Sequence, residues 1–124
     1  AMQYKTKEGV QGICPDGWHI PTLTEFTELE NYINNKSAAL IDESETLDFT
    51  PTVTQNETGF SALFAGQLGS TGNFSSLGNA TRFWSSAEYY SDTAGSMFLF
   101  NSYSIVSLYY DGKEIGFSVR CVQD

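Results

Sequence analysis

Two cysteines bracket almost the whole chain, and this feature restricts the fold more than any other. Cys14 and Cys121 are the only cysteines in the 124-residue sequence. A pair so far apart cannot form the CxxC spacing of a redox or zinc motif. We therefore expect a disulfide that joins the two ends of the domain, with two buried free thiols as the alternative. In the chain-entropy model, closing a loop of about 100 residues contributes roughly 4–5 kcal/mol.

The length and composition indicate a single globular domain over residues 1–124. Aromatic residues make up 15% of the chain, and they supply enough buried area for a packed core. No stretch approaches the roughly 20 apolar residues of a membrane-spanning helix, so we expect no direct membrane insertion.

The charge balance excludes one class of partner. The net charge is −9, and the chain has only six lysine and arginine residues. Binding to nucleic acid depends on basic side chains that displace counterions from phosphates, and an acidic chain is repelled by anionic polymers. We therefore expect no nucleic-acid partner.

The first half of the sequence predicts helix. In "HIPTLTEFTELENYINN", Thr22 and Glu25 have the spacing of a capping box. One apolar stripe follows at helical spacing and ends near residue 34: Leu23, Phe26, Leu29 and Ile33. The segment "SAALI" predicts a short second helix or a turn. The later segment "GFSALFAGQLGSTGNFSSLG" predicts loops with buried aromatic anchors.

The second half changes to the two-residue period of strands. We expect one strand in "TRFWSSAEY" and three more at about 96–102, 105–110 and 115–122, with Asp111-Gly112 as a hairpin signal. Trp18 and Trp84 are expected in the core, and Arg120 is expected to pair with a carboxylate such as Glu88 or Glu25. Helix before strands indicates an α+β fold.

Four segments resemble one protein family: "GICPDGWHIPTLTEFTELENYI", "GFSALFAGQ", "FWSSAEY" and "GFSVRCVQD". In this order they are similar to the Fibrobacter succinogenes major paralogous domain, which is abundant in secreted and surface proteins of Bacteroidetes-type bacteria. The resemblance implies a C-type-lectin-like fold, distantly related to the formylglycine-generating, sulfatase-modifying group. In that fold an N-terminal helix or helices precede a twisted antiparallel sheet with long irregular loops, and the termini lie together. It also implies an extracellular or cell-surface location.

Some lectin-like proteins are diversified by retroelements near the C-terminus, and residues 88–113 occupy the corresponding region. We expect a ligand-binding or adhesion module that recognises carbohydrate or protein there. The candidate ligand-binding residues are Glu88, Tyr89, Tyr90, Asp92, Asn101, Tyr103, Tyr109, Tyr110 and Asp111. Tyrosine gives rigid contact area at low entropic cost, but alternate aromatics on strands also pack into cores. The alternative function is a structural module, or a subunit of a surface appendage or multidomain protein, without a small-molecule ligand.

The sequence favours neither an enzyme nor a cofactor. The chain lacks the Glu-Pro-Asn, Gln-Pro-Asp and Trp-Asn-Asp triplets that C-type lectins use for calcium-dependent sugar binding. The acidic stretch around Asp42, Glu43, Glu45 and Asp48 could hold a structural calcium ion, although a solvated loop is the simpler interpretation. His19, the single histidine, is expected to be structural. Glu88 is the only carboxylate that we consider as a catalytic candidate, and we expect a binding or structural role for it instead.

Overall fold

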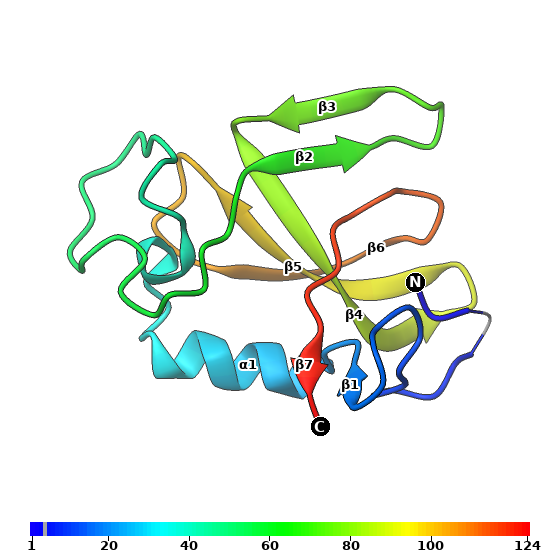
Figure 1. Cartoon of the computed structure of the whole chain (residues 1–124). Helices are drawn as coiled ribbons and strands as arrows, with labels where there is room; N and C mark the ends of the chain where they lie inside the picture. Colours follow the sequence, from blue (N-terminus) through cyan, green and yellow to red (C-terminus); the bar gives the residue numbers. More distant parts are fainter. Residues whose placement is uncertain (4) are drawn as a thin grey trace.

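The computed structural model describes residues 1–3 and 5–124, which form one α-helix, one 3-10 helix and two β-sheets (Figure 1). The elements follow the order β1 (Trp18–His19), α1 (Leu23–Tyr32), η1 (Ser37–Leu40), β2 (Ala65–Leu68), β3 (Phe74–Leu77), β4 (Ala80–Tyr90), β5 (Thr93–Phe100), β6 (Ser107–Gly112) and β7 (Val122–Gln123). The short strand β1 comes first, followed by the helical elements and then the main sheet.

The main sheet has five strands in the order β3-β2-β4-β5-β6, and β1 pairs with β7 in a separate two-stranded sheet. The expected antiparallel sheet is mixed, because β2 runs parallel to β4 through the pair Gly66 and Thr81. The other pairs of the main sheet are antiparallel. Figure 1 shows α1 on one side of the long β4–β5–β6 ribbon and the β2–β3 hairpin at the opposite end of the view.

The helix α1 begins as its sequence predicts. The Thr22 hydroxyl accepts a hydrogen bond from the Glu25 backbone N–H at 3.1 Å, and the Glu25 carboxylate accepts one from the Thr22 N–H at 2.8 Å. This capping box satisfies two N–H groups that an uncapped helix would leave free. The "SAALI" segment forms the 3-10 helix η1, which is buried throughout.

The core lies between α1, η1 and one face of the main sheet. Cross-strand neighbours Phe83, Met97 and Leu108 project from this face, and Phe26 of α1 packs into the same cluster. Gly95 lets the start of α1 approach β5, because a Cβ there would lie 2.7 Å from Ser85 Oγ and 3.1 Å from Leu23 Cδ1. Burial of these apolar side chains is the main source of stability.

The segment expected to form loops around buried aromatics contains the β2–β3 hairpin, so that prediction is wrong for the two strands. Phe64, just before β2, is buried as expected, but Phe74 on β3 is 82% exposed. Gly66 allows the two strands to approach, since it has φ +74° and an added Cβ would lie 2.3 Å from the Ser75 carbonyl oxygen. Glycine and serine weaken strand patterns in a sequence, and here backbone pairing overrides that weakness.

The hairpin predicted at Asp111-Gly112 is also wrong. Both residues lie inside β6, where they pair with Ala94 and Thr93 of β5. The chain then crosses from the β6 edge of the sheet to β2, where Gly116 bridges Leu68. The predicted last strand at 115–122 is therefore reduced to isolated bridges and the two residues of β7. Trp18, expected in the core, lies on β1 and is exposed.

The two ends of the domain are joined as predicted. Cys14 and Cys121 form a disulfide with a Cα–Cα distance of 5.9 Å, and β1 lies beside β7. The last residue also participates, because the Asp124 backbone N–H donates to the Gly17 carbonyl at 2.9 Å.

His19 connects this junction to α1. Its Nδ1 lies 2.6 Å from Asp124 Oδ1, and its Nε2 lies 2.8 Å from Glu25 Oε1. The hydrogen bond to Asp124 raises the pKa of His19 against the opposing effect of burial, and Glu25 adds to the rise. Burial favours a higher pKa for Glu25, but its hydrogen bonds from the Thr22 N–H and from His19 prevail and lower that pKa. The structural role predicted for His19 agrees with these contacts.

Reduction of the disulfide should lower stability by roughly 4–5 kcal/mol, because the unfolded chain regains the freedom of a loop of about 100 residues. Thermal melting of the oxidised protein, the reduced protein and Cys14→Ser would measure this. The two altered forms should melt at similar, lower temperatures. Two free thiols titrated in the untreated native protein would contradict the assignment.

Stability should fall as the pH rises from about 6.5 through the raised pKa of His19. The raised pKa of His19 means that its charged pairing is complete below its usual value of 6.5 and is lost as the pH rises through the folded-state pKa. The lowered pKa of Glu25 means that its contribution is lost only on acidification below its usual 4.5. Melting temperatures across this range should show the decline, and His19→Gln should flatten it. An equal decline in His19→Gln would assign it to other groups.

Candidate ligand-binding site

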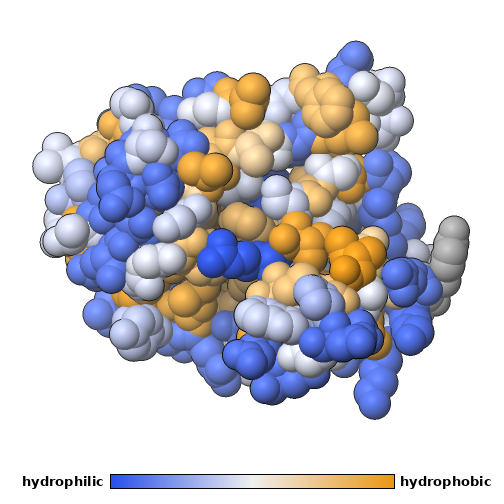
Figure 2. Space-filling model, viewed as in Figure 1, coloured by the Kyte–Doolittle hydropathy of each residue, from blue (hydrophilic) through white to orange (hydrophobic). Residues whose placement is uncertain are grey.

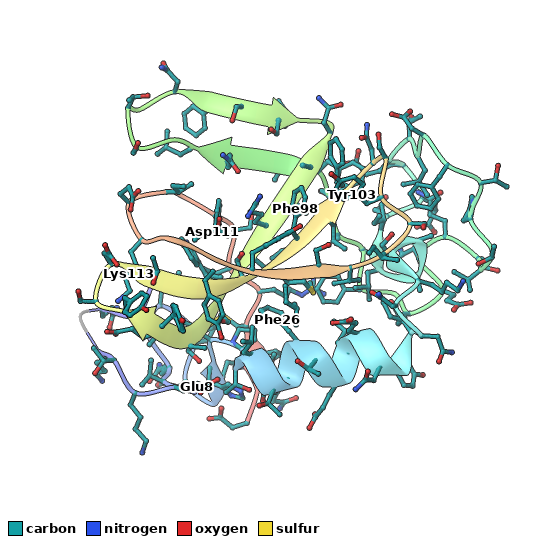
Figure 3. The ribbon with its side chains drawn as sticks, turned by 180° about the vertical axis from the view of Figure 1, so that it is seen from behind. Glu8, Phe26, Phe98, Tyr103, Asp111 and Lys113 are labelled. Carbon is teal, nitrogen blue, oxygen red and sulfur yellow. A yellow bond between two sulfur atoms is a disulfide. The ribbon has the colours of Figure 1, made fainter. Side chains whose placement is uncertain are left out.

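The face of the main sheet that points away from α1 is lined by aromatic rings around one ion pair. We call it the outer face. Its residues come from β4, β5, β6 and the neighbouring loops: Arg82, Trp84, Ala94, Ser96, Phe98, Phe100, Tyr103, Tyr109, Asp111 and Phe117. Figure 3 places Phe98, Tyr103 and Asp111 on the side of the sheet opposite Phe26 and α1.

Strand register explains why these side chains meet. Arg82 pairs with Phe98, and Ser96 pairs with both Trp84 and Tyr109. Directly paired residues project to the same side of a sheet. The alternate residues of β5, Met97 and Leu99, project to the other side and are fully buried in the core.

The rings of the outer face contact one another but remain accessible to solvent. The Phe98 and Phe100 rings are nearly parallel, at 15° and 5.9 Å between centroids. Tyr103 packs on the edge of Phe100 at 4.9 Å, and Tyr109 lies 6.1 Å from Phe98. Tyr103 and Tyr109 are nevertheless 46% and 45% exposed. These contacts hold the rings in position without covering them.

An ion pair lies among these rings. Arg82 Nη1 donates to Asp111 Oδ2 at 2.7 Å, and the Ser96 hydroxyl donates to the same oxygen at 2.6 Å. The Arg82 guanidinium lies 4.3 Å from the centre of the Phe98 ring, within the range of a cation–π contact. Arg82 Nε is buried and has no hydrogen-bond partner among the described residues. The guanidinium therefore retains hydrogen-bonding capacity that the pair does not use.

A second group of exposed rings lies at the β4–β5 turn. We call Tyr89, Tyr90 and Tyr110 the tyrosine cluster. The Tyr89 ring lies 4.4 Å from that of Tyr90 and stacks at 4.6 Å on that of Tyr110. All three are between 50% and 62% exposed. Tyr110 alternates with Tyr109 along β6, so it projects to the opposite side of the sheet from the outer face.

A hollow of about 610 Å³ lies beside Trp84, where the N-terminal residues approach β4. Glu88 and Lys113 line it and form an ion pair at 3.2 Å. Trp84 also stacks on Phe117 at 4.4 Å, so the hollow adjoins the outer face. The partial exposure of Trp84 corrects its assignment to the core.

The nine predicted ligand residues thus occupy two places. Five of them lie near the β4–β5 turn: Glu88, Tyr89, Tyr90, Asp92 and Tyr110. The other four belong to the outer face or its margin: Asn101, Tyr103, Tyr109 and Asp111. The contact of Asp92 is made by its backbone: its carbonyl accepts a hydrogen bond from the Lys113 N–H at 2.8 Å. Asn101 donates from its side chain to Asn79 at 3.3 Å.

Sequence reasoning missed Arg82, Phe98, Phe100 and Lys113 as site residues. The alternation of Phe98 and Phe100 with Met97 and Leu99 was visible, but both sets are apolar. Nothing in the pattern distinguishes the covered face from the open one. The partner of Arg82 is 29 residues away, and only the pairing of β4, β5 and β6 brings Asp111 beside it.

Arg120 makes a different contact from the one predicted. Its guanidinium lies 4.4 Å from the centre of the Phe60 ring. The two carboxylates proposed as its partners are engaged elsewhere, Glu25 with His19 and Glu88 with Lys113. The prediction of an ion pair for Arg120 is therefore wrong.

The acidic stretch at 42–48 is organised by local hydrogen bonds. The Asp42 carboxylate accepts a hydrogen bond from Ser44, and the Glu43 carboxylate accepts one from Asn56. The Glu45 carboxylate accepts one from the Phe64 N–H, and the Asp48 carboxylate accepts one from Ser102. Within residues 1–3 and 5–124, no group of three or more histidine, cysteine, aspartate or glutamate side chains is placed to hold a metal ion. Nor does that part of the chain contain a helix long and apolar enough for a membrane span.

Comparison with known proteins assigns the family. The family model of the Fibrobacter succinogenes major domain matches residues 2–123, almost the full chain. The chain belongs to this family. No curated protein and no solved structure matches the domain. The family resemblance read from the four sequence segments is therefore confirmed.

Proposed function

We propose that this Fibrobacter succinogenes major domain is a secreted or cell-surface module that binds a carbohydrate or protein ligand, without catalysis. The outer face forms the main binding surface, and the tyrosine cluster is a second group of exposed rings near the β4–β5 turn. One observation carries the proposal: the sheet face that points away from α1 gathers partly exposed aromatic rings around one ion pair.

This observation is informative because an antiparallel sheet with one solvated face normally carries polar residues there. Half-exposed rings that gather over neighbouring strands are typical of interaction sites. Tyrosine suits this role since its ring gives contact area at a low entropic cost, and its hydroxyl can bond to a polar ligand. Five of the predicted tyrosines are between 45% and 62% exposed.

We further propose a C-type-lectin-like relationship, which the joined termini and the helix-first order support. If residues 88–113 are diversified by a retroelement, the changes should fall on exposed positions such as Tyr89 and Tyr109. Met97, Leu99 and Val106 lie in the same stretch but are buried in the core, so they should stay apolar. The disulfide and the acidic charge agree with an extracellular location.

The proposal predicts that the double variant Tyr89→Ser/Tyr109→Ser loses at least tenfold in affinity for its ligand, because it removes one ring from each exposed group. Glycan arrays and pull-downs from cell-wall or host extracts would identify the ligand, and surface plasmon resonance would measure its affinity.

Tyr32→Ser is the matched control, since Tyr32 is 78% exposed but lies on α1. It should bind as the unmodified domain does. Equal losses in the control and the double variant, or no ligand in either screen, would count against the proposal.

A second candidate function is a structural module that assembles with neighbours. The edge strand β3 supports it, because Phe74 and Leu77 are among the most exposed apolar residues. Residues 58–81 carry no charged side chain, although the chain as a whole is strongly acidic. Figure 2 shows apolar atoms on the surface of this hairpin at the top of the view. An uncharged, exposed edge is a ready site for association.

If β3 is an assembly edge, the domain should form larger species as its concentration rises, and Phe74→Lys should keep it monomeric by placing a charge on the edge. Light scattering over a concentration series would measure this, with Tyr32→Lys as an equally exposed control. A monomer at all concentrations would reject this second function.

A further inference from the structure

We propose that the outer face binds a neutral carbohydrate chain, with its rings holding the sugar faces and the Arg82–Asp111 pair holding the hydroxyls. This inference rests on the proposed binding function and assigns its ligand class. It follows from three properties of the outer face: the rings, the free hydrogen-bonding groups and the charge.

The rings provide apolar surfaces for sugar rings. An aromatic ring carries negative charge density on its face, and the polarised C–H bonds on one side of a pyranose can pack against it. Tyr103 and Tyr109 are accessible for this contact, and Phe98 and Phe100 lie beside them. Because the rings already contact one another, little side-chain entropy remains to be lost on binding.

The ion pair provides matching polar groups. The hydrogen bond between Arg82 and Asp111 joins Nη1 to Oδ2, and the Ser96 hydroxyl also donates to Oδ2. These contacts leave Nη2 as a donor and Oδ1 as an acceptor. Two adjacent hydroxyls of a sugar can accept from the first and donate to the second. Hydrogen bonds to charged groups are stronger than neutral ones, so this pair can orient the sugar.

The charge favours a neutral ligand. Arg82 is the cation among the outer-face residues, and its charge is balanced by Asp111 at 2.7 Å. The chain carries a net charge of −9, which repels acidic polysaccharides. A protein partner would have to desolvate the ion pair and match it with fixed groups of its own. A carbohydrate hydroxyl can both donate and accept hydrogen bonds, so hydroxyls alone can pair with the Arg82 guanidinium and with the Asp111 carboxylate.

The shape of the surface favours a chain over a single sugar. Outer-face residues follow β5 from Ala94 to Phe100, a length of about 20 Å at the usual strand rise. The hollow beside Trp84 continues the outer face at the Ala94 end and adds the Glu88–Lys113 pair. A linear oligosaccharide of several units could lie along this line.

The test uses immobilised neutral polysaccharides (glucan, mannan, xylan and galactan) and a uronic-acid polymer as the acidic counterpart, with affinities measured by isothermal titration calorimetry on derived oligosaccharides. We expect binding to at least one neutral polymer and weaker binding to the acidic one. Tyr109→Ser and Asp111→Asn should each reduce the affinity at least tenfold. Tyr32→Ser should stay within twofold of the unmodified domain.

Thermal melting of each variant separates loss of binding from loss of folding. If Asp111→Asn does not fold, Tyr103→Ser provides the second outer-face variant, with the same tenfold loss expected. Binding only to the acidic polymer, or neutral binding unchanged by Tyr109→Ser, would overturn the inference. A protein ligand bound through the same residues, with no neutral polysaccharide bound, would overturn the inference and leave the proposed function standing. No ligand of either class would reject both.

Discussion

The covalent link between Cys14 and Cys121 is the constraint on which the rest of the structure depends. It holds the segment before α1 against the segment that follows the main sheet, and β1 and β7 pair beside it. His19 extends this junction by contacting both Asp124 and the capping residue Glu25. The start of the helix and the end of the chain are therefore fixed to one another. Because α1 is held in place, it covers one face of the sheet, and the partly exposed rings lie on the other face.

The open face explains why the second half of the chain is so rich in aromatic residues. Met97 and Leu99 complete the core on the covered side, and Phe98 and Phe100 alternate with them on the open side. A face intended only for water would carry polar side chains. The Arg82–Asp111 pair also lies among these rings, about four-fifths buried, where its geometry is more constrained than that of a surface pair. The combination of apolar rings with a fixed polar centre is characteristic of sites that recognise polar ligands.

The sequence predicted those elements whose structure depends on interactions between residues close together in the chain. The capping box at Thr22 and Glu25, the 3-10 turn after it and the long strand β4 all follow from neighbouring residues. The disulfide followed from the positions of its two cysteines. The β2–β3 hairpin could not be predicted, because Gly66 and its neighbours pair through backbone contacts that leave no hydrophobic period. The hairpin turn predicted at Asp111-Gly112 does not form, because pairing with β5 continues β6 through both residues. The tyrosines of the site were identified from composition, but their partition between two faces depends on strand register.

The position of the disulfide has a mechanical consequence. A pulling force applied to the segments on either side of the domain would enter near Cys14 and leave near Cys121, whose Cα atoms are 5.9 Å apart. The load would pass through the sulfur bond and bypass the intervening chain, which spans a sequence separation of 107 residues. The sheet between the two cysteines would therefore be shielded from tension applied at the ends of the domain.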